Sequence, residues 1–310
     1  MSTLPGEGMP AAPRTLGKTV ARESWRGFWE SARYGALLPW TARSRLAGVA
    51  YSGLCGSVEY RLDAWRREAA VGRIERWLSV DEDRARAIFR STLRSEAREE
   101  ADVSWLMHHP AELAQAFRLG TDEPSGEGPA IWATLHLGSP NLAFVYLRCI
   151  RGRDVRIVAR PLDETNPMPE AKRVWGHRKV AWLENVTAAP FLGTSAEAMS
   201  IARSRLLKGA SIFVLMDVPG DIVSRSVTVE LFGERVRIAA GIFVLSRMLG
   251  VPIRPIVAIP RGGQIELRYG RAIEPITNGL PTAAIERELT TILRDLPGEW
   301  WLWPYLPVAL

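Results

Sequence analysis

Cysteine, lysine and histidine are scarce in this chain of 310 residues. With only Cys55 and Cys149, the sequence excludes a framework of several disulfides and fits a reducing compartment. Three of the four histidines, His108, His109 and His177, raise the question of a metal site. Neither an HExxH pattern nor a Cys/His cluster accompanies them, so we expect no metal.

Positive charge is carried almost entirely by arginine, because lysine occurs only four times among 40 basic residues. The formal net charge is +6 and the pI is about 9.7. Such a balance attracts anionic partners in general, namely phospholipid head groups, coenzyme A, acyl carrier protein or nucleic acid. Without a helix-turn-helix, zinc-finger or RNP pattern, nucleic acid is not expected. A solvated basic surface is the simpler interpretation of charge alone.

Long apolar runs are also missing. Residues 1–20 are rich in Pro and Gly, are expected to be disordered, and lack the apolar core of a signal peptide. No stretch of about 18 uncharged apolar residues occurs, so we expect no transmembrane helix and a cytoplasmic protein. Residues 22–60 mix aromatic, aliphatic and Arg side chains. They fit a membrane-interface segment or a helix packed on its own domain, and both interpretations stay open.

The periodicity of apolar residues predicts one domain over residues 21–310 with two kinds of structure. Residues 21–119 read as helical, residues 120–128 as a polar loop, and residues 129–310 as alternating strands and helices. We therefore predict an α/β fold, a mixed central sheet flanked by helices, with a helical N-terminal segment. The predicted strands are 131–135, 155–159, 180–183, 211–216, 227–232, 253–259 and 265–269, and the predicted helices are 141–150, 194–207, 239–249 and 284–296.

His136 is the most informative residue of the sequence. It follows the apolar run 131–135, which reads as a buried strand, and precedes a Gly-Ser-Pro turn into a helix. Ligands of open α/β sheets bind at this end of the strands. Histidine is also the natural general base near neutral pH, so we predict this role for His136. A histidine that only caps a loop is the alternative.

Three further features stand beside His136. Arg160 follows a predicted strand and is suited to hold an anionic oxygen. Asp217 ends the buried strand 211–216, where it is either a site carboxylate or a turn-capping residue before Val-Pro-Gly. Phe232 and Gly233 close another predicted strand ahead of a helix.

These features occur in an order that resembles the lysophospholipid acyltransferase superfamily, in particular its lipid A biosynthesis (lauroyl/myristoyl) branch. The resemblance spans about residues 25–305. Each segment is only weakly specific by itself, but the set of segments in this order is fairly specific. The matching segments are His136 with its following helix, Arg160-Pro161, 207–217 (LKGASIFVLMD), Phe232-Gly233, 250–255 (GVPIRP) and 297–303 (PGEWWLW).

The resemblance implies that His136 removes a proton from an acceptor hydroxyl that attacks an acyl thioester. The family has Asp or Glu five residues after this His, and here the position is Asn141. Asn141 would orient the ring without supplying charge. Alternatively Asp217 partners His136, or the chain is a degenerate, non-catalytic copy. The sequence also departs from the family in lacking basic residues after the last Trp and an N-terminal anchor, which disfavours a lipid A substrate.

The resemblance further implies substrate-binding roles for Arg160, Phe232, Gly233 and Glu299. Backbone N–H groups near Gly138 are expected to help hold the developing oxyanion.

Several other side chains admit two interpretations. An apolar tunnel for an acyl chain and ordinary core packing both explain the aromatic residues Phe213, Phe243, Trp300, Trp301 and Trp303. Ser139 and Ser195 lack a Gly-x-Ser-x-Gly elbow and are not expected to be nucleophiles.

The sequence hypothesis is therefore an acyltransferase that needs no cofactor. It uses acyl-CoA or an acyl carrier protein as donor, acts on a hydroxyl or amine, forms no acyl-enzyme and contacts an anionic membrane surface at most peripherally. A non-catalytic acyl- or carrier-binding protein and a thioesterase are the rivals. The acceptor, the acyl length and the oligomeric state stay open.

Overall fold

Polar side chains cap the three long helices in the first part of the chain. In the computed structural model, which describes residues 25–124, 128–163 and 168–306, Ser44, Asp63 and Asp81 each accept a hydrogen bond from the backbone N–H three residues later. A helix over 25–32 leads into η1 (Arg33–Leu37), α2 (Leu38–Trp40), η2 (Thr41–Arg43), α3 (Arg45–Leu62), α4 (Ala64–Leu78), α5 (Glu82–His108) and η3 (Pro110–Glu112). The expectation of disorder over residues 1–20 falls outside the described residues.

The prediction that helices continue to residue 119 is wrong at its end, because β1 (Phe117–Leu119) is a strand. This edge strand pairs in parallel with β8 (Gln264–Tyr269), which supplies partners for its backbone N–H and C=O groups. The remaining strands are β2 (Ile131–Thr134), β3 (Val155–Ile157), β4 (Ser211–Leu215), β5 (Ser226–Leu231), β6 (Glu234–Ala239), β7 (Ile253–Arg261) and β8 (Gln264–Tyr269).

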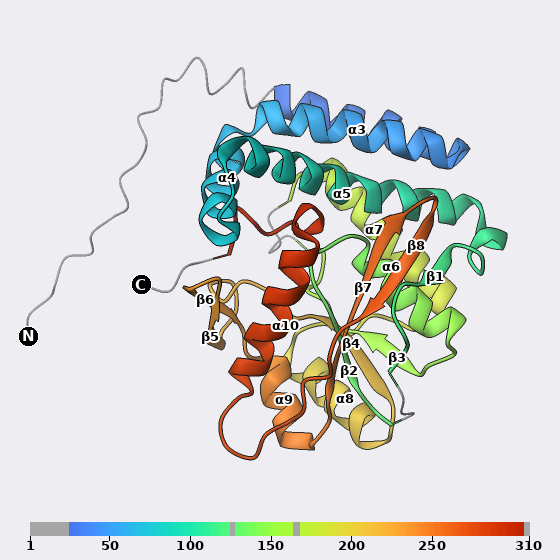
Figure 1. Cartoon of the computed structure of the whole chain (residues 1–310). Helices are drawn as coiled ribbons and strands as arrows, with labels where there is room; N and C mark the ends of the chain where they lie inside the picture. Colours follow the sequence, from blue (N-terminus) through green and yellow to red (C-terminus); the bar gives the residue numbers. More distant parts are fainter. Residues whose placement is uncertain (1–24, 125–127, 164–167, 307–310) are drawn as a thin grey trace, which may run out of the picture.

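Six strands form one mixed sheet in the order β1-β8-β7-β2-β4-β3. The pairs of β2 with β7, β2 with β4 and β3 with β4 are parallel, and β7 with β8 is antiparallel. Helices flank this sheet, with α3, α4 and α5 forming a layer across its top in Figure 1. The predicted α/β architecture with a mixed central sheet and a helical N-terminal segment is therefore confirmed.

Both faces of the sheet are buried at its centre, which explains why β2 and β4 are nearly continuous apolar runs. Along β2, Ile131 and Ala133 join the hydrophobic cluster on one face, and Trp132 joins the cluster on the other. Along β4, Ile212 and Phe213 divide in the same way. The covering helices are α6 (Pro140–Val145), η4 (Tyr146–Ile150), α7 (Glu170–Thr187), α8 (Ala196–Leu207), α9 (Gly241–Leu249) and α10 (Thr282–Asp295).

Two local predictions are wrong. The apolar run 180–183 is part of α7, not a strand, and the buried residues Gly176, Leu183 and Thr187 of this helix lie at helical spacing. A four-residue apolar run does not by itself distinguish a strand from one face of a helix. The sequence also missed β6, which forms an antiparallel hairpin with β5 outside the main sheet.

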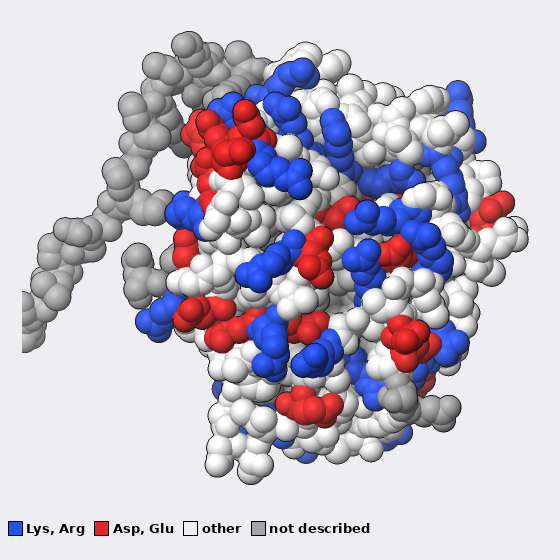
Figure 2. Space-filling view, viewed as in Figure 1, with Lys and Arg blue, Asp and Glu red and all other residues white. Residues whose placement is uncertain are grey.

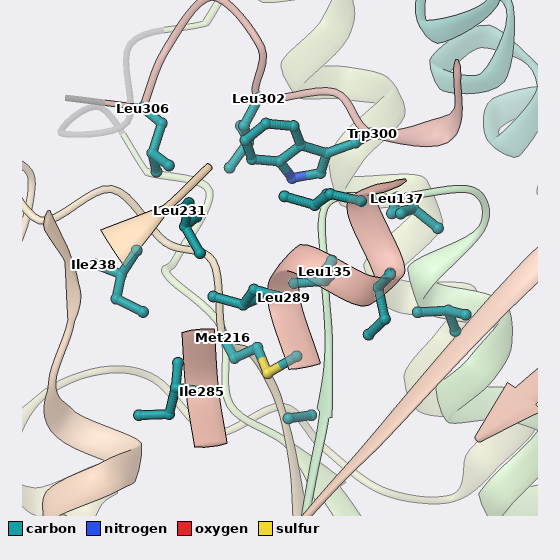
Figure 3. Packing of buried hydrophobic residues seen from close by; sticks show 14 of the residues in the cluster. Leu135, Leu137, Met216, Leu231, Ile238, Ile285, Leu289, Trp300, Leu302 and Leu306 are labelled. Atoms are coloured by element: carbon teal, nitrogen blue, oxygen red, sulfur yellow. The ribbon is translucent and has the colours of Figure 1, made fainter. Parts of the chain in front are cut away.

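The helical segment and the sheet share one core. Trp77 of α4 stacks on Phe232 and on Trp300, and α5 packs against η5 (Pro297–Glu299). Figure 3 shows the indole of Trp300 beside Leu302 and above Leu137, with Leu289 and Met216 deeper in the same cluster. Among the described residues, no helix is long and apolar enough to span a bilayer.

Candidate active site

Strand register brings His136 and Asp217 together at one edge of the sheet. β2 and β4 are parallel neighbours, with Thr134 beside Leu215 at their carboxyl ends. His136 and Asp217 each follow two residues after these register partners, so their side chains lie side by side beyond the strand ends. His136 Nδ1 lies 2.9 Å from Asp217 Oδ1. Two residues 81 positions apart in the sequence thus form a dyad where α/β sheets bind ligands.

The carboxylate of Asp217 is held by three donors. Oδ1 faces the imidazole, and Oδ2 accepts hydrogen bonds from the backbone N–H of His136 and from Nε1 of Trp300, each at 2.8 Å. The side chain of Asp217 is only 3% exposed and that of His136 is 27% exposed. The acid is therefore buried and oriented, while the base reaches the surface of a cavity.

This arrangement assigns the tautomer of His136. Because an ionised carboxylate only accepts hydrogen bonds, the proton between the two side chains belongs to Nδ1 of the imidazole. Nε2 then carries a lone pair, and it has no hydrogen-bond partner among the described residues. The geometry is that of a general base whose ring is fixed by an acid.

The C-terminal segment clamps the loop that carries His136. The backbone N–H of Trp301 donates to the carbonyl of His136 at 2.8 Å, and that of Gly138 donates to the carbonyl of Glu299 at 3.1 Å. Gly138 adopts a φ of +60°, and an added Cβ would collide with the carbonyl oxygen of Ala258. Only glycine fits this turn without strain.

A large apolar cavity opens beside the dyad. It has a volume of about 770 Å³, and His136 and Arg160 are among its polar lining residues. The walls come from the ends of β3 and β4, from α8 and α9, and from the C-terminal segment. The apolar lining side chains are Val158, Ala159, Met199, Ile212, Val214, Leu215, Val218, Pro219, Ile222, Val223, Ala239, Ile242 and Leu302, with Tyr305 at the C-terminal side.

The side chain of Asn141, in contrast, forms its hydrogen bond with Glu99 and not with His136. Its Nδ2 donates to Oε1 of Glu99 on α5 at 2.7 Å. Glu99 is buried and also accepts from Nζ of Lys179 at 3.2 Å. The expectation that Asn141 orients the imidazole is therefore wrong. Of the two partners considered for His136, the structure places Asp217 in contact with it.

The expected oxyanion role for the backbone near Gly138 is also contradicted. The N–H groups of residues 136 to 139 all have acceptors inside the protein, namely Asp217 Oδ2 and the carbonyls of Leu135, Glu299 and Ala258. An N–H that already donates within the fold is not preorganised for a substrate oxygen. Arg160 on the cavity wall is the better placed cation.

Phe232 and Gly233 are a turn, not part of the cavity lining. They form the two-residue connection of the β5–β6 hairpin, with φ of +53° and +81°. The ring of Phe232 stacks on Trp77 with centroids 5.3 Å apart. Their predicted substrate-binding role has no geometric support, because the hairpin turn points into the helical layer.

Glu299 supports the loop that carries His136 and lies outside the cavity. Its Oε2 accepts a hydrogen bond of 2.5 Å from the hydroxyl of Ser95, and its carbonyl holds Gly138. Burial raises the pKa of Glu299 above its ordinary value, although the Ser95 hydrogen bond opposes this. Glu299 does not line the cavity, so its contacts position the His136 loop and do not reach a substrate there.

The aromatic side chains considered for an acyl tunnel are mostly core residues. Phe213, Phe243, Trp300 and Trp303 are fully buried and absent from the cavity wall. The sequence analysis therefore missed the role of Trp300 as a donor to Asp217. The recurrence of Trp at 300, 301 and 303 after an acid marked this segment, but nothing in it indicated a partner 83 residues away.

The remaining sequence candidates have structural explanations. Nδ1 of His108 lies 2.8 Å from the carbonyl of Ser104, and Nε2 of His109 lies 2.8 Å from that of Ala42. His177 is exposed on α7. Ser195 caps α8 by accepting a hydrogen bond from the backbone N–H of Ala198. In the described part of the chain, no group of three His, Cys, Asp or Glu side chains is placed to hold a metal ion.

No protein-family model matches the sequence, and the search of curated proteins found no significant match.

Proposed function

We propose that this chain is an acyltransferase that moves an acyl group from a thioester donor, acyl-CoA or acyl carrier protein, to a hydroxyl or amine. The observation that carries the proposal is the dyad of His136 and the buried Asp217 on the wall of a 770 Å³ apolar cavity. The dyad supplies a base, and the cavity fits an acyl chain.

Direct transfer needs only the groups present. Nε2 of His136 removes the acceptor proton while the acceptor oxygen or nitrogen forms a bond to the thioester carbon. The C–S bond then breaks, and the imidazolium returns the proton to the departing thiolate. Asp217 stabilises the imidazolium that forms between these steps. No acyl-enzyme is required.

Arg160 has the proposed role of binding negative charge. It lines the cavity together with His136. A guanidinium there suits the oxyanion of the tetrahedral intermediate or a phosphate of a substrate, because it offers several N–H donors in one plane. In this proposal Arg160 binds the oxyanion that the backbone N–H groups near Gly138 were expected to hold.

The dyad also supports membership of the lysophospholipid acyltransferase superfamily as a proposal. Asn141 stands where the family has its acid, and Asp217 occupies the position of the imidazole partner instead. This substitution argues against the degenerate, non-catalytic alternative, because the base keeps a carboxylate.

A cytoplasmic enzyme at the inner face of the membrane is the proposed setting. Exposed apolar side chains occur at the start of the helical segment, where Trp25 stacks on Phe28, and on the outer side of α3 at Leu46 and Val49. Apolar and aromatic groups exposed next to arginines suit the interface of an anionic bilayer.

Mass spectrometry of thioester consumption tests the function. The purified protein is incubated with a panel of acyl-CoAs and acyl carrier proteins, with and without hydroxyl and amine acceptors. We expect thioester loss that disappears in His136→Ala and persists in the matched control His108→Ala. Among the described residues, the hydrogen-bond contact of the His108 ring is with the carbonyl of Ser104 on the same helix.

The mass of the product decides between the candidate reactions. A product heavier than the acceptor by the acyl group supports transfer. Free fatty acid as the only product in the presence of all acceptors would assign a thioesterase instead. Thioester loss that is equal in wild type and His136→Ala would overturn the assignment of His136 as base.

A further inference from the structure

A second concavity lies in the helical layer, between α3 and α5 and away from the dyad. Its volume is about 240 Å³, and it is lined by Gly56, Ser57, Tyr60, Arg61, Arg90 and Arg94. Half of these residues are arginines, and no carboxylate lies on its wall among the described residues. Basic side chains follow α3 and α5 across the face drawn in Figure 2.

Arg90 and Arg94 differ from other arginines of α5 in that no ion pair joins them to a carboxylate among the described residues. Arg86 pairs with Glu82 at 2.5 Å, and Arg98 pairs with Asp102 at 2.8 Å, each across one helical turn. Arg90 and Arg94 lie between them in the same i, i+4 row. The helix offers these two residues only other arginines at that spacing, so no carboxylate of α5 pairs with them across one turn.

Both arginines contact α3 although they are exposed. The Cζ of Arg90 lies 4.4 Å from the centroid of the Tyr60 ring. The stem of Arg94 lies against α3 at Gly56, where an added Cβ would come within 2.5 Å of Arg94 Cγ. A glycine at this position therefore lets Arg94 lie close against the neighbouring helix.

The recognition chemistry of the pocket is that of arginine. Ser57 uses its hydroxyl proton on the carbonyl of Gly53 at 2.8 Å, which leaves Arg61, Arg90 and Arg94 as the charged donors. Three like charges in one concavity repel each other unless an anion lies between them. Guanidinium groups bind phosphate oxygens with paired N–H donors. The volume is smaller than a site for a whole drug-sized ligand, and suits one phosphate group with part of the molecule that carries it.

We propose that this pocket binds the phosphate group of a phosphorylated small molecule. One source of that group is the nucleotide part of a coenzyme A donor, in which case the inference also rests on the proposed function. Arg94 is followed by Ser95, whose hydroxyl holds Glu299 behind the His136 loop. The pocket and the dyad are thus on different sides of α5, and a helix with its side chains is about 10–12 Å wide.

Calorimetric titration tests the pocket without requiring turnover. The probes are coenzyme A, dephospho-coenzyme A and inorganic phosphate, added to the full chain at low and moderate salt. We expect coenzyme A or phosphate to bind wild type, and the affinity to fall at least about tenfold in the double variant Arg90→Gln/Arg94→Gln. Arg86→Gln removes a charge from the same helix and is expected to keep the affinity within about twofold, because Glu82 already occupies that guanidinium.

Two further variants separate the possible explanations. Gly56→Ala keeps the net charge but displaces Arg94, so it is expected to weaken binding as well. His136→Ala is expected to bind the probes like wild type, so that a failure of the catalytic proposal leaves this measurement intact. Weaker binding of dephospho-coenzyme A than of coenzyme A assigns the 3′-phosphate as the bound group, and equal binding of both assigns another phosphate of the molecule.

Three results would overturn the inference. The first is probe binding that is unchanged in Arg90→Gln/Arg94→Gln. The second is no binding of any phosphate probe to wild type. The third is a double variant that loses binding to phosphatidylglycerol vesicles but keeps its affinity for the phosphate probes, which would assign these arginines to a lipid surface.

Discussion

The side chain of Asp217 contacts His136 twice, at the Nδ1 atom of the ring and at the backbone N–H. Oδ1 contacts the ring and Oδ2 accepts from the backbone N–H, so the carboxylate fixes both the imidazole and the strand end that carries it. Trp300 completes the arrangement from the C-terminal segment. The orientation of the base therefore depends on β2, β4 and the last residues of the described chain together.

Asp217→Asn should abolish most of the activity without unfolding the protein. The backbone of His136 and the indole of Trp300 both donate to Oδ2, so the amide oxygen must take that place and its NH₂ must face Nδ1. The imidazole would then carry its proton on Nε2 and could not act as base. We expect thioester turnover to fall by a factor of about 100 or more, with an unchanged circular dichroism spectrum. Turnover close to wild type would exclude the dyad from catalysis.

Trp300→Phe should separate the hydrogen bond from the packing. The ring is fully buried among Trp77, Trp303 and the leucines of Figure 3, and phenylalanine preserves much of that contact. Loss of the Nε1 donor leaves one acceptor site of the buried carboxylate unpaired, which costs about 1–3 kcal/mol. Urea unfolding should show this loss, and kcat should fall about tenfold. Trp65→Phe, on an exposed side chain of α4, is the control.

Asn141→Asp should destabilise the chain and should not raise its activity. Nδ2 of Asn141 donates to the buried Glu99, so an aspartate here would place two carboxylates in contact, with only Lys179 to compensate. We expect the free energy of unfolding at pH 7 to fall by about 1–3 kcal/mol, because a buried acceptor loses its donor. A faster enzyme of equal stability would show that the family position of the acid still acts on His136.

Met199→Trp should shorten the acyl chains that the enzyme accepts. Met199 lies on α8 at the wall of the cavity, and the larger side chain would fill part of the 770 Å³. In competition assays with acyl-CoAs of different lengths, the preferred length should decrease while the shortest donors keep their kcat/KM. Met248→Trp, on an exposed residue of α9, should leave the preference unchanged. Equal shifts in both variants would argue against this cavity as the acyl site.

Asp102 should make the stability depend on pH. Burial raises the pKa of this carboxyl to about 6, although Arg98 opposes the shift, and one of its oxygens has no hydrogen-bond partner. The folded state then binds the proton more tightly than the unfolded state, so stability should rise as pH falls from 7 through 6 towards the ordinary value near 4. We expect the gain between pH 7 and 4 to be about 2 kcal/mol larger than in Asp102→Asn, measured by urea unfolding. Parallel pH profiles would contradict the shift.

Much of the fold was predictable because strand and helix periodicity is a local property. Predicted strands at 131–135 and 211–216 and the helix at 194–207 correspond to β2, β4 and α8. The strand prediction at 180–183 failed because a run of four apolar residues fits both periods. β6 was missed although its polar and apolar residues alternate as in a half-buried strand, and its pairing with β5 lies outside the main sheet.

The sequence by itself determined the elements of this protein and the strand ends at which His136 and Asp217 lie, because apolar patterning and turn residues act over a few positions. Only the tertiary structure decided which carboxylate faces the imidazole. The parallel pairing of β2 with β4 aligns residues 81 positions apart, while Asn141 at the start of α6 donates to Glu99 on α5 instead. Strand order and helix packing decide which distant residues come into contact, and the spacing of residues along the sequence does not show this.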